Sequence, residues 1–323
     1  MRVVITGGCG FLGRRVALQL LARGDVDELV LFDNAPSALP LPEDKRLSVL
    51  TGDIADSETV RRVISGGTHS VFHLAAVVSG QAEADTDLGY RVNLDGTRAV
   101  LDACRALGTC PRVVFASSLA VYGGTLPPAV GDETPLTPQT SYGTQKAIGE
   151  LLLSDYSRRG FLDGVGIRLP TICVRPGEPN QAASGFFSSI IREPLNDEEA
   201  VLPVPEDVRH WFASPRAAVD FLLHAAAIES AALGDRRCLT MPGVSETVAG
   251  QIAALQNVAG DAVVRLIRRE PDETIMRIVA GWPRKFDARR ALELGFRAEV
   301  DFAEIVRVYV EDELGGRIGG RES

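Results

Sequence analysis

Two side chains four positions apart, Tyr142 and Lys146, have the types and the spacing to move a proton. On a helix they lie on one face a turn apart, so the lysine ammonium can lower the pKa of the tyrosine phenol and prepare it as a general base. Ser117 and Ser118 precede them, where a hydroxyl at a strand end would hold a substrate oxygen. An isolated pair of this kind is more often a packed ring beside a solvated cation, so its meaning depends on the surrounding elements.

The amino terminus predicts a strand, a tight turn and a helix. Its short β-branched run ends at Thr6 in a glycine-rich segment, and apolar residues resume at helical spacing over residues 11–23. Gly7 permits the turn, Gly10 lets backbone amides approach a pyrophosphate at the positive helix end, and Gly13 lets the helix pack closely on the strand. These residues predict a dinucleotide-binding site.

A second apolar run ends in an acid, Asp33, about 20 residues after the last of these glycines. A carboxylate at this place can accept hydrogen bonds from the adenosine ribose of NAD. The 2′-phosphate of NADP would bring a like charge beside it, and no arginine follows at residues 34–36 to offset that charge. Asp33 therefore favours NAD, the alternative being an ordinary turn residue at a strand end.

Strand-like and helical runs alternate through the first half of the chain. The strand-like runs lie at residues 47–50, 70–74, 112–115 and 165–169, and the helical runs at residues 56–64, 82–107 and 142–158. This alternation predicts an α/β fold with a Rossmann-type, doubly wound parallel sheet, because continuous apolar runs suit strands that are buried on both faces. Ligands bind beyond the carboxyl ends of such strands.

Small and polar residues follow these strands and would converge on one crevice. Ala75 and Ala76 would let a cofactor pass close to the backbone, and Asp53 could accept a hydrogen bond from the adenine amine. We expect His73 to be a core histidine, because no carboxylate or cysteine lies at ligand spacing from it.

The pattern becomes irregular after residue 170. We expect residues 1–170 to form an NAD-binding Rossmann domain and residues 171–314 mostly a smaller mixed α/β substrate-binding region, with some segments returning to the Rossmann sheet. Helices are expected at residues 213–228, 244–258 and 302–313, with Ser245 as the N-cap of the second. The glycine-rich residues 315–323 predict a flexible tail.

Composition limits the kinds of partner. The net charge of −9 argues against nucleic acid or an acidic membrane, because both need a basic surface. The five cysteines are scattered and odd in number, so they indicate small buried residues rather than disulfides or a metal site. No amino-terminal signal run and no stretch of about 18 apolar residues is present, and we expect a cytoplasmic protein.

Together these motifs resemble the extended short-chain dehydrogenase/reductase superfamily, which includes NAD-dependent epimerases and dehydratases. The resemblance is carried by Gly7, Gly10 and Gly13, Gly52-Asp53, residues 73–76, Val92-Asn93, Ser117-Ser118 with residues 121–123, Tyr142 with Lys146, and Glu150. It implies a Rossmann domain, bound NAD, a homodimer, and Ser118, Tyr142 and Lys146 as the catalytic group. Ser118 is preferred to Ser117 because it precedes Val121 at the spacing of the family.

Residues 77–85, 137–151, 168–177 and 279–283 more narrowly resemble dehydrogenases of short sugar acids. This likeness implies NAD-dependent oxidation of D-erythronate at C2 to 2-dehydro-D-erythronate, with Tyr142 as the base. The expected NAD site consists of Gly7, Gly10, Phe11, Leu12, Gly13, Asp33, Asp53, Ile54, Leu74, Ala75, Ala76, Asn93, Tyr142, Lys146, Pro170 and Thr171. The expected substrate site consists of Ser79, Gln81, Ser118, Tyr142, Thr171, Arg175 and Asn180.

Arg175 is the first candidate to bind the substrate carboxylate, because it lies in the loop after the strand that should pass the nicotinamide. Ser79, Gln81, Thr171 and Asn180 are neutral candidates for the same group. Arg175 could instead be a solvated loop residue or a structural partner of Glu178.

Other functions stay open at this point. Residues 209–211 lie where nucleotide-sugar members of the superfamily place an arginine against phosphate, which keeps a nucleotide-sugar epimerase with tightly bound NAD as an alternative. Against it, Pro170-Thr171 replaces the Phe-Asn of many epimerases, and Leu119-Ala120 replaces the Asp-Glu pair of the dehydratases. A uronate or another aldonate is an alternative substrate. A non-catalytic NAD sensor is disfavoured, because Tyr142 and Lys146 are retained.

Overall fold

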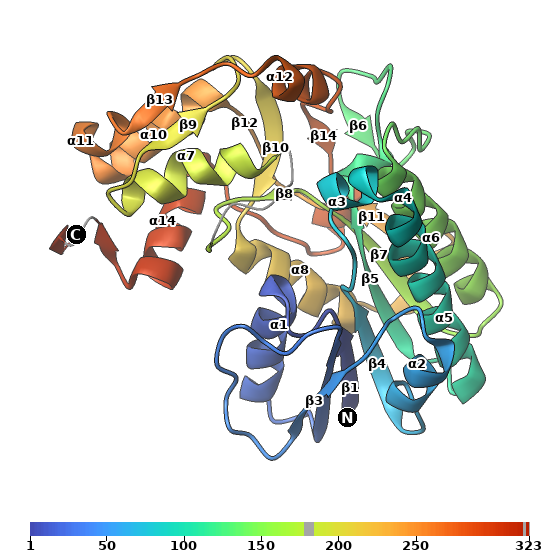
Figure 1. Cartoon of the computed structure of the whole chain (residues 1–323). Coiled ribbons are helices and arrows are strands. Elements are labelled where there is room, and N and C mark those ends of the chain that lie inside the picture. The colour runs from blue at the N-terminus through green and yellow to red at the C-terminus, as the bar shows by residue number, and fades with distance from the viewer. Residues whose placement is uncertain (178–183, 319–320, 323) are drawn as a thin grey trace. The chain divides into compact units, whose positions relative to one another are not determined.

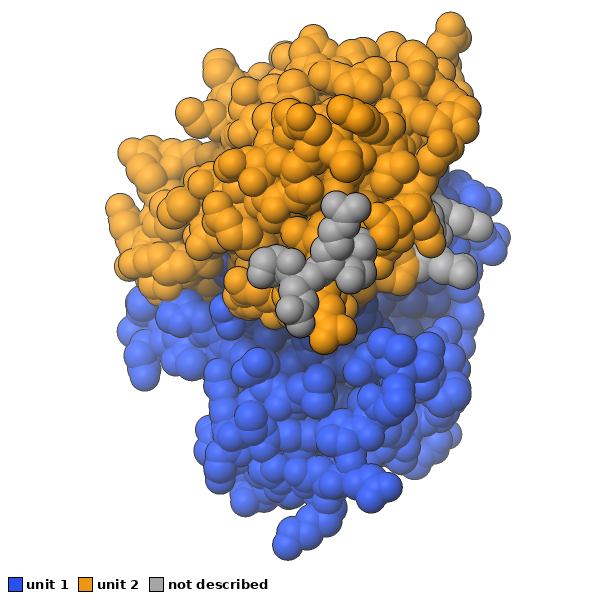
Figure 2. All heavy atoms as spheres, turned by 90° about the vertical axis from the view of Figure 1, so that its left-hand side faces the viewer, with its two compact units in different colours: residues 1–121, 138–168, 219–239 blue, residues 122–137, 169–218, 240–323 orange. Residues whose placement is uncertain are grey.

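The computed structural model describes residues 1–177, 184–318 and 321–322 (Figure 1). The chain forms two compact units, coloured separately in Figure 2. Unit 1 comprises residues 1–121, 138–168 and 219–239, and unit 2 comprises residues 122–137, 169–218 and 240–323. The division at residue 168 lies close to the expected boundary. Residues 122–137 group with unit 2, however, and residues 219–239 return to unit 1.

Unit 1 is built on a seven-stranded sheet in the order β11-β7-β5-β4-β1-β2-β3. The strands are β1 (Arg2–Thr6), β2 (Glu28–Asp33), β3 (Leu47–Thr51), β4 (Thr68–His73), β5 (Arg112–Ser118), β7 (Asp163–Leu169) and β11 (Cys238–Thr240). Strands β3, β2, β1, β4 and β5 pair in parallel. The order reverses at β1, so the loops after β1 and β4 mark the switch point at which ligands bind in such sheets. The Rossmann-type prediction is therefore confirmed.

Helices cover both faces of this sheet: α1 and α8 lie along one face, and α2, α5 and α6 along the other (Figure 1). The helices are α1 (Phe11–Ala22), α2 (Ser57–Val63), α3 (Ser79–Ala84), α4 (Thr86–Gly89), α5 (Gly96–Leu107), α6 (Ser141–Arg158), α8 (Pro215–Ala227) and α9 (Ser230–Leu233). Five residues from strands β1, β2, β4 and β5 are fully or almost fully buried beneath the helices, which is typical of strands covered on both faces: Val4, Val30, Val71, Val113 and Phe115.

The prediction of one helix over residues 82–107 was wrong. Asp85 has φ −130° and separates α3 from α4, because its side chain accepts a hydrogen bond from the Leu88 amide and caps the second helix. After α4 the chain widens into a π-helical segment, η1 (Tyr90–Asp95), and then continues as α5. Such widened turns are frequent at functional sites.

Unit 2 contains a three-stranded sheet in the order β12-β10-β8, and three two-stranded pairs, β13-β9, β14-β6 and β15-β16. The strands are β6 (Val130–Gly131), β8 (Thr171–Ile172), β9 (Ala200–Leu202), β10 (Arg209–Ala213), β12 (Val244–Thr247), β13 (Ile267–Arg269), β14 (Phe286–Asp287), β15 (Arg317–Ile318) and β16 (Arg321–Glu322). The helices are α7 (Gly185–Leu195), α10 (Val248–Ala259), α11 (Asp261–Val264), α12 (Glu273–Ala280), α13 (Arg289–Glu293) and α14 (Phe302–Leu314). Phe187, Phe212 and Phe302 lie at the centre of its core.

Two predictions for the carboxyl-terminal half need correction. Residues 244–247 form a strand, because they pair with β10, and the N-cap of α10 is Thr247 rather than Ser245. The Thr247 hydroxyl accepts from the Gly250 amide at 3.0 Å, whereas the Ser245 hydroxyl donates to the Arg284 carbonyl. The expected tail carries the short antiparallel pair β15 and β16, and its flexibility stays a prediction.

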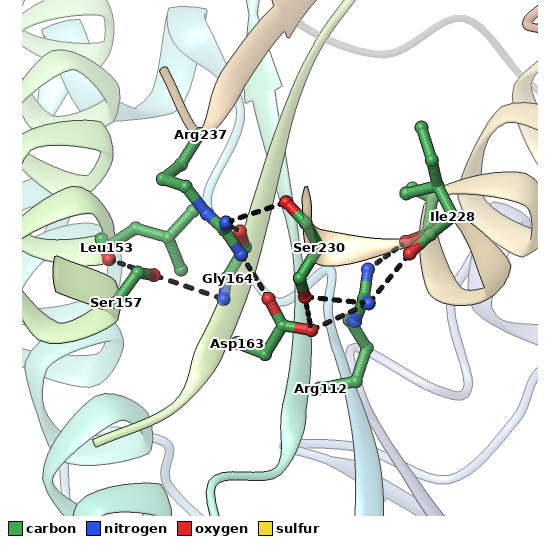
Figure 3. A network of polar contacts seen from close by, with 9 residues as sticks. Arg112, Leu153, Ser157, Asp163, Gly164, Ile228, Ser230 and Arg237 are labelled. Atoms are coloured by element: carbon green, nitrogen blue, oxygen red, sulfur yellow. Dashed lines mark hydrogen bonds and ion pairs between the residues drawn. The ribbon is translucent and has the colours of Figure 1, made fainter. Parts of the chain in front are cut away.

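An ionic network joins the start of β5 and β7 to the segment that returns from unit 2 (Figure 3). Asp163 pairs with Arg112 at 2.6 Å and also with Arg237, and it accepts a hydrogen bond from Ser230. Arg112 donates to the Ala225 carbonyl at 3.0 Å and caps the last turn of α8. The three charged side chains are 12–20% exposed, so water screens their attraction little.

Two histidines are buried without charge. His73 is 1% exposed between the Thr6 and Thr97 hydroxyls, at 2.7 Å and 2.9 Å, which confirms the core histidine. Burial lowers the pKa of His73 to about 3, and burial lowers the pKa of His210, in unit 2, to about 4. An unfolded histidine titrates near 6.5, so below that pH the unfolded chain binds protons that the folded chain does not bind.

We therefore expect the free energy of unfolding to be highest above pH 6.5 and to fall as the pH is lowered. The two histidines together account for roughly 3 kcal/mol between pH 6.5 and pH 5. Urea unfolding at these two values measures the change. His73→Asn should reduce the loss by about half, whereas equal stability of the wild type at both pH values would contradict the prediction.

Candidate active site

The strand end and the helix predicted to carry the chemistry lie together in unit 1. Tyr142 and Lys146 lie on the first turns of α6, which begins after Thr140, whose hydroxyl accepts from the Gly143 amide at 3.0 Å. The Lys146 ammonium lies 5.7 Å from the centre of the Tyr142 ring and donates to the carbonyl of Ala116 in β5 at 2.8 Å. Lys146 is buried, whereas Tyr142 and Ser118 are partly exposed and can be reached by a ligand.

The first turn of α6 approaches the turn after Ser118 closely enough to exclude a side chain. A Cβ on Gly143 would lie 2.1 Å from the Ala120 carbonyl oxygen, well inside van der Waals contact. The Ala120 amide in turn donates to the Ser118 hydroxyl oxygen at 3.1 Å. Gly143 therefore sets the distance between the helix that carries Tyr142 and the turn that carries Ser118.

We expect Gly143→Ala to lower kcat by about 10²-fold, because a shift of about 1 Å between reacting groups can cost that much. NADH formation at saturating substrate measures the effect. The matched control is Gly24→Ala, where an added Cβ would meet no described atom within 4 Å. Equal kcat values for the two variants would show that the close approach does not position the site.

The structure separates the roles of the two serines. The Ser117 hydroxyl is buried and donates to the Glu150 carboxylate at 2.6 Å. Glu150 also pairs with Arg168 at 2.7 Å, and these two charged side chains are 3% and 7% exposed. Ser117 thus belongs to a buried network, which supports the choice of Ser118 as the hydroxyl that faces a ligand.

Burial lowers the pKa of Lys146 to about 8, and the nearby Glu150 carboxylate opposes this shift. The lysine ammonium has three hydrogens and donates one to Ala116. Two donors and the positive charge therefore remain for other groups, and the charge favours ionisation of the nearby Tyr142 phenol.

The glycine loop after β1 fits a dinucleotide. Gly7 has φ +69°, and a Cβ there would lie 2.7 Å from the Ala75 amide nitrogen after β4. A Cβ on Gly13 would lie 2.3 Å from the Gly7 carbonyl oxygen. Gly10 precedes α1 and has no side chain to cap it, so the first amides of the helix are available to a pyrophosphate.

Asp33 ends β2 beside this loop. One carboxylate oxygen accepts from the Cys9 amide at 2.9 Å, and the other accepts from the Asn34 amide at 2.8 Å. Each oxygen keeps a lone pair that can accept a ribose hydroxyl. The cradle and the acid are the arrangement expected for NAD.

A model of the NAD dependent epimerase/dehydratase family matches residues 3–231, which span the glycine loop, Ser118, Tyr142 and Lys146. The chain belongs to this family. NAD is its cofactor, and the resemblance to extended short-chain dehydrogenases/reductases is confirmed.

Relatives within the family match almost the whole chain. A D-erythronate dehydrogenase of Cupriavidus necator is 53% identical over 322 residues, which are 97% of this chain and 98% of that protein. A D-erythronate dehydrogenase of Haemophilus influenzae is 45% identical over 316 residues, 97% of this chain and 100% of that protein. The crystal structure of a nucleoside-diphosphate-sugar epimerase from Agrobacterium tumefaciens is 53% identical, with a TM-score of 0.95 over 98% of this chain and 95% of that chain.

Two residues expected to bind NAD in this family member already have protein partners. Asp53 is exposed, accepts from the Ala55 amide at 2.9 Å and pairs with Arg91. Asn93 lies in η1, and its side chain holds both backbone groups of Val77, at 2.9 Å and 3.1 Å. The adenine role of Asp53 and the NAD contact of Asn93 stay predictions.

Asn93 also reveals a residue that the sequence analysis missed. Its amide donates to the side-chain oxygen of Gln145 at 2.8 Å, and Gln145 is fully buried directly before Lys146. The contact joins the segment after β4, through Val77, to the helix that carries the Tyr-Lys pair. The sequence feature that could have pointed to this residue is a glutamine placed between Tyr142 and Lys146, the two proposed catalytic residues of the helix.

The remaining predicted positions are distributed over both units. Leu74, Ala75 and Ala76 follow β4, Ile54 is buried after β3, and Phe11 and Leu12 begin α1. Ser79 and Gln81 lie on α3, Pro170 and Thr171 lie at the start of β8, and Arg175 follows it. The Arg175 amide donates to the Ser188 hydroxyl, and its carbonyl accepts from Arg192 at 2.8 Å. Asn180 and Glu178 lie outside the described residues, and the ligand contacts of all these residues stay predictions.

Cysteine burial was predicted correctly for Cys104, Cys173 and Cys238, but Cys9 is partly exposed and Cys110 is exposed. The prediction was wrong for these two because Cys9 lies in the turn after β1 and Cys110 in the loop before β5, at a positive φ of +53°. Within the described ranges, no group of three or more His, Cys, Asp or Glu residues could hold a metal ion. Over the same part of the chain, no helix has the length and apolarity needed to cross a membrane.

Proposed function

We propose that this protein is an NAD-dependent dehydrogenase that oxidises the C2 hydroxyl of D-erythronate to 2-dehydro-D-erythronate. The observation that carries the proposal is the similarity to two D-erythronate dehydrogenases, which are 53% and 45% identical over 97% of this chain. The presence of Ser118, Tyr142 and Lys146 in the unit that also carries the dinucleotide loop supports it, because alcohol oxidation needs a base and a hydride acceptor.

Tyr142 is the proposed base and takes the proton of the C2 hydroxyl as a phenolate. The Ser118 hydroxyl donates to the same substrate oxygen, and the Ala120 amide occupies one acceptor site of Ser118, which leaves its hydrogen free to point elsewhere. Lys146 stabilises the phenolate with its positive charge. NAD, when bound, accepts the hydride from C2.

Arg175 is proposed to bind the substrate carboxylate, with Ser79, Gln81, Thr171 and Asn180 as neutral candidates. A guanidinium can hold a carboxylate through two parallel hydrogen bonds, which orients the acid as well as attracting it. The net charge of −9 makes such a local cation necessary for an anionic substrate.

A nucleotide-sugar epimerase is the second candidate, because the similar Agrobacterium tumefaciens structure is described as a nucleoside-diphosphate-sugar epimerase. Three features favour the dehydrogenase. Pro170-Thr171 and Leu119-Ala120 replace residues typical of epimerases and dehydratases. The guanidinium of Arg209, which would have to meet a phosphate, donates to the Ser245 carbonyl at 2.9 Å.

The deciding experiment measures NADH formation at 340 nm with purified protein and D-erythronate, L-threonate, D-glucuronate or UDP-glucose. Fastest turnover with D-erythronate is expected, and NADP should support a much lower kcat/KM than NAD because of Asp33. Fastest turnover with L-threonate or D-glucuronate would move the protein to another sugar acid. Interconversion of UDP-sugars without release of NADH would make it an epimerase. NAD binding without any turnover would leave an NAD sensor.

The proposal includes a cytoplasmic homodimer. Leu151 on α6 is 67% exposed, and a two-fold contact of α5 and α6 with a second copy would cover such a side chain. Light scattering after gel filtration tests the dimer, and a monomer at micromolar concentration would contradict it.

A further inference from the structure

A buried histidine of unit 2 contacts a predicted substrate residue. His210 on β10 is 5% exposed, and its Nε2 lies 2.7 Å from the hydroxyl oxygen of Thr171 on β8. The two strands pair in parallel, so the contact is set by the sheet. Thr171 itself is partly exposed and can meet a ligand.

Aromatic rings hold the imidazole in one orientation. Phe187 stacks on it with centroids 5.3 Å apart and an interplanar angle of 2°, and Trp282 lies 5.1 Å away. The ring is uncharged at neutral pH, because burial lowers the pKa of His210 to about 4. A neutral imidazole has one nitrogen that donates and one that accepts.

The surroundings decide which nitrogen carries the hydrogen. The Pro283 carbonyl interacts with the ring, and a carbonyl oxygen can accept but not donate. We place the hydrogen on Nδ1, the nitrogen that Thr171 does not engage, because the Pro283 carbonyl can only accept. Nδ1 makes no hydrogen bond of normal geometry to the described residues. Nε2 then has a free lone pair, and the Thr171 hydroxyl donates to it.

We propose that His210 is a positioning residue that takes up the hydroxyl hydrogen of Thr171, so that the Thr171 oxygen accepts a hydrogen bond from a hydroxyl of the sugar-acid substrate. A threonine hydroxyl has one hydrogen, and once it is donated to His210 the oxygen can only accept. A carboxylate also only accepts, so Thr171 is removed from the candidates for that group. The identity of the substrate rests on the proposed function. The contact with Thr171 would favour an acid that carries several hydroxyl groups over an acid without them.

The first test does not depend on activity. Nitrogen-15 NMR of the histidine rings, with His210→Gln to assign the signal among four histidines, reports which nitrogen is protonated. We expect a neutral ring with hydrogen on Nδ1 at pH 7. Hydrogen on Nε2 would overturn the proposal, because Thr171 would then accept from His210 and keep its own hydrogen for a carboxylate.

The second test is a double-mutant cycle with Thr171→Val and His210→Asn. We expect each variant to lower kcat/KM for D-erythronate about tenfold, mainly through KM, the usual size for one hydrogen bond of this kind. The double variant should have a kcat/KM no lower than that of Thr171→Val alone, because His210 acts through Thr171. Additive losses would overturn the proposal.

Two further measurements separate this role from a structural one. His210→Gln, whose amide oxygen can reach the place of Nε2, should recover most of the activity lost in His210→Asn. NADH affinity, from fluorescence titration, should stay unchanged in the His210 variants, and a loss of NADH affinity without a change in KM would assign the donor to the cofactor amide instead. If the wild type does not oxidise D-erythronate, the proposed function fails, but the NMR result still decides the direction of the Thr171 hydroxyl.

Discussion

Tyr142→Phe is expected to lower kcat for D-erythronate by a factor of roughly 10² to 10⁴, the usual contribution of a general base. The phenyl ring keeps the packing of Tyr142, but it has no oxygen to take the proton of the C2 hydroxyl. Binding loses at most one hydrogen bond with that oxygen, so KM and the affinity for NADH should change by about tenfold or less. Steady-state NADH formation and fluorescence titration measure the two effects separately.

The matched control for this variant is Tyr156→Phe on the same helix. The Tyr156 hydroxyl donates to the Asp102 carboxylate at 2.8 Å and lies outside the site. Loss of the Tyr156 hydroxyl should leave kcat within about a factor of two of the wild-type value, since this hydroxyl touches no reacting group. If Tyr142→Phe retained more than a tenth of kcat, the base would have to be another group.

Glu150→Gln is expected to have the largest effect on stability. Glu150 and Arg168 are 3% and 7% exposed and lie 2.7 Å apart, so the substitution leaves a buried guanidinium without its counter-charge. Breaking such a pair costs about 3–5 kcal/mol. The amide also alters the hydrogen bond from Ser117 and removes a charge that favours the ammonium of Lys146. Urea unfolding measures the loss of free energy.

Asp155→Asn is the control for this second prediction. Asp155 pairs with Arg158 on the surface of the same helix, where the two side chains are 43% and 69% exposed. Exposed pairs contribute less than about 1 kcal/mol, so the control should be nearly as stable as the wild type. Equal stability of Glu150→Gln and Asp155→Asn would mean that water reaches the buried pair.

The local sequence pattern was sufficient to predict much of the structure of unit 1. Apolar strands, the Gly7 turn and the close packing at Gly13 are encoded by neighbouring residues, so the parallel sheet and its dinucleotide loop could be predicted. The pairing of Tyr142 with Lys146 follows from helical periodicity alone.

Contacts between distant segments could not be predicted. The π-helical segment η1 carries Asn93, whose partner Gln145 is 52 residues further along the chain. Residues 244–247 form a strand because β10 offers them a partner, with Trp211 opposite Ser245, although the sequence itself suits a helix start. The link from His210 to Thr171 spans 39 residues and depends on the packing of two strands.

The network around Asp163 has a consequence for synthesis of the chain. Asp163 is made 74 residues before its partner Arg237, a delay of roughly 4 to 15 s at ribosomal speeds of about 5–20 residues per second. During that interval β7 is an apolar edge strand, because β11 does not yet exist to pair with it. The nascent chain therefore passes through a stage in which unit 1 has an open sheet edge, whose unpaired backbone groups could pair with another strand.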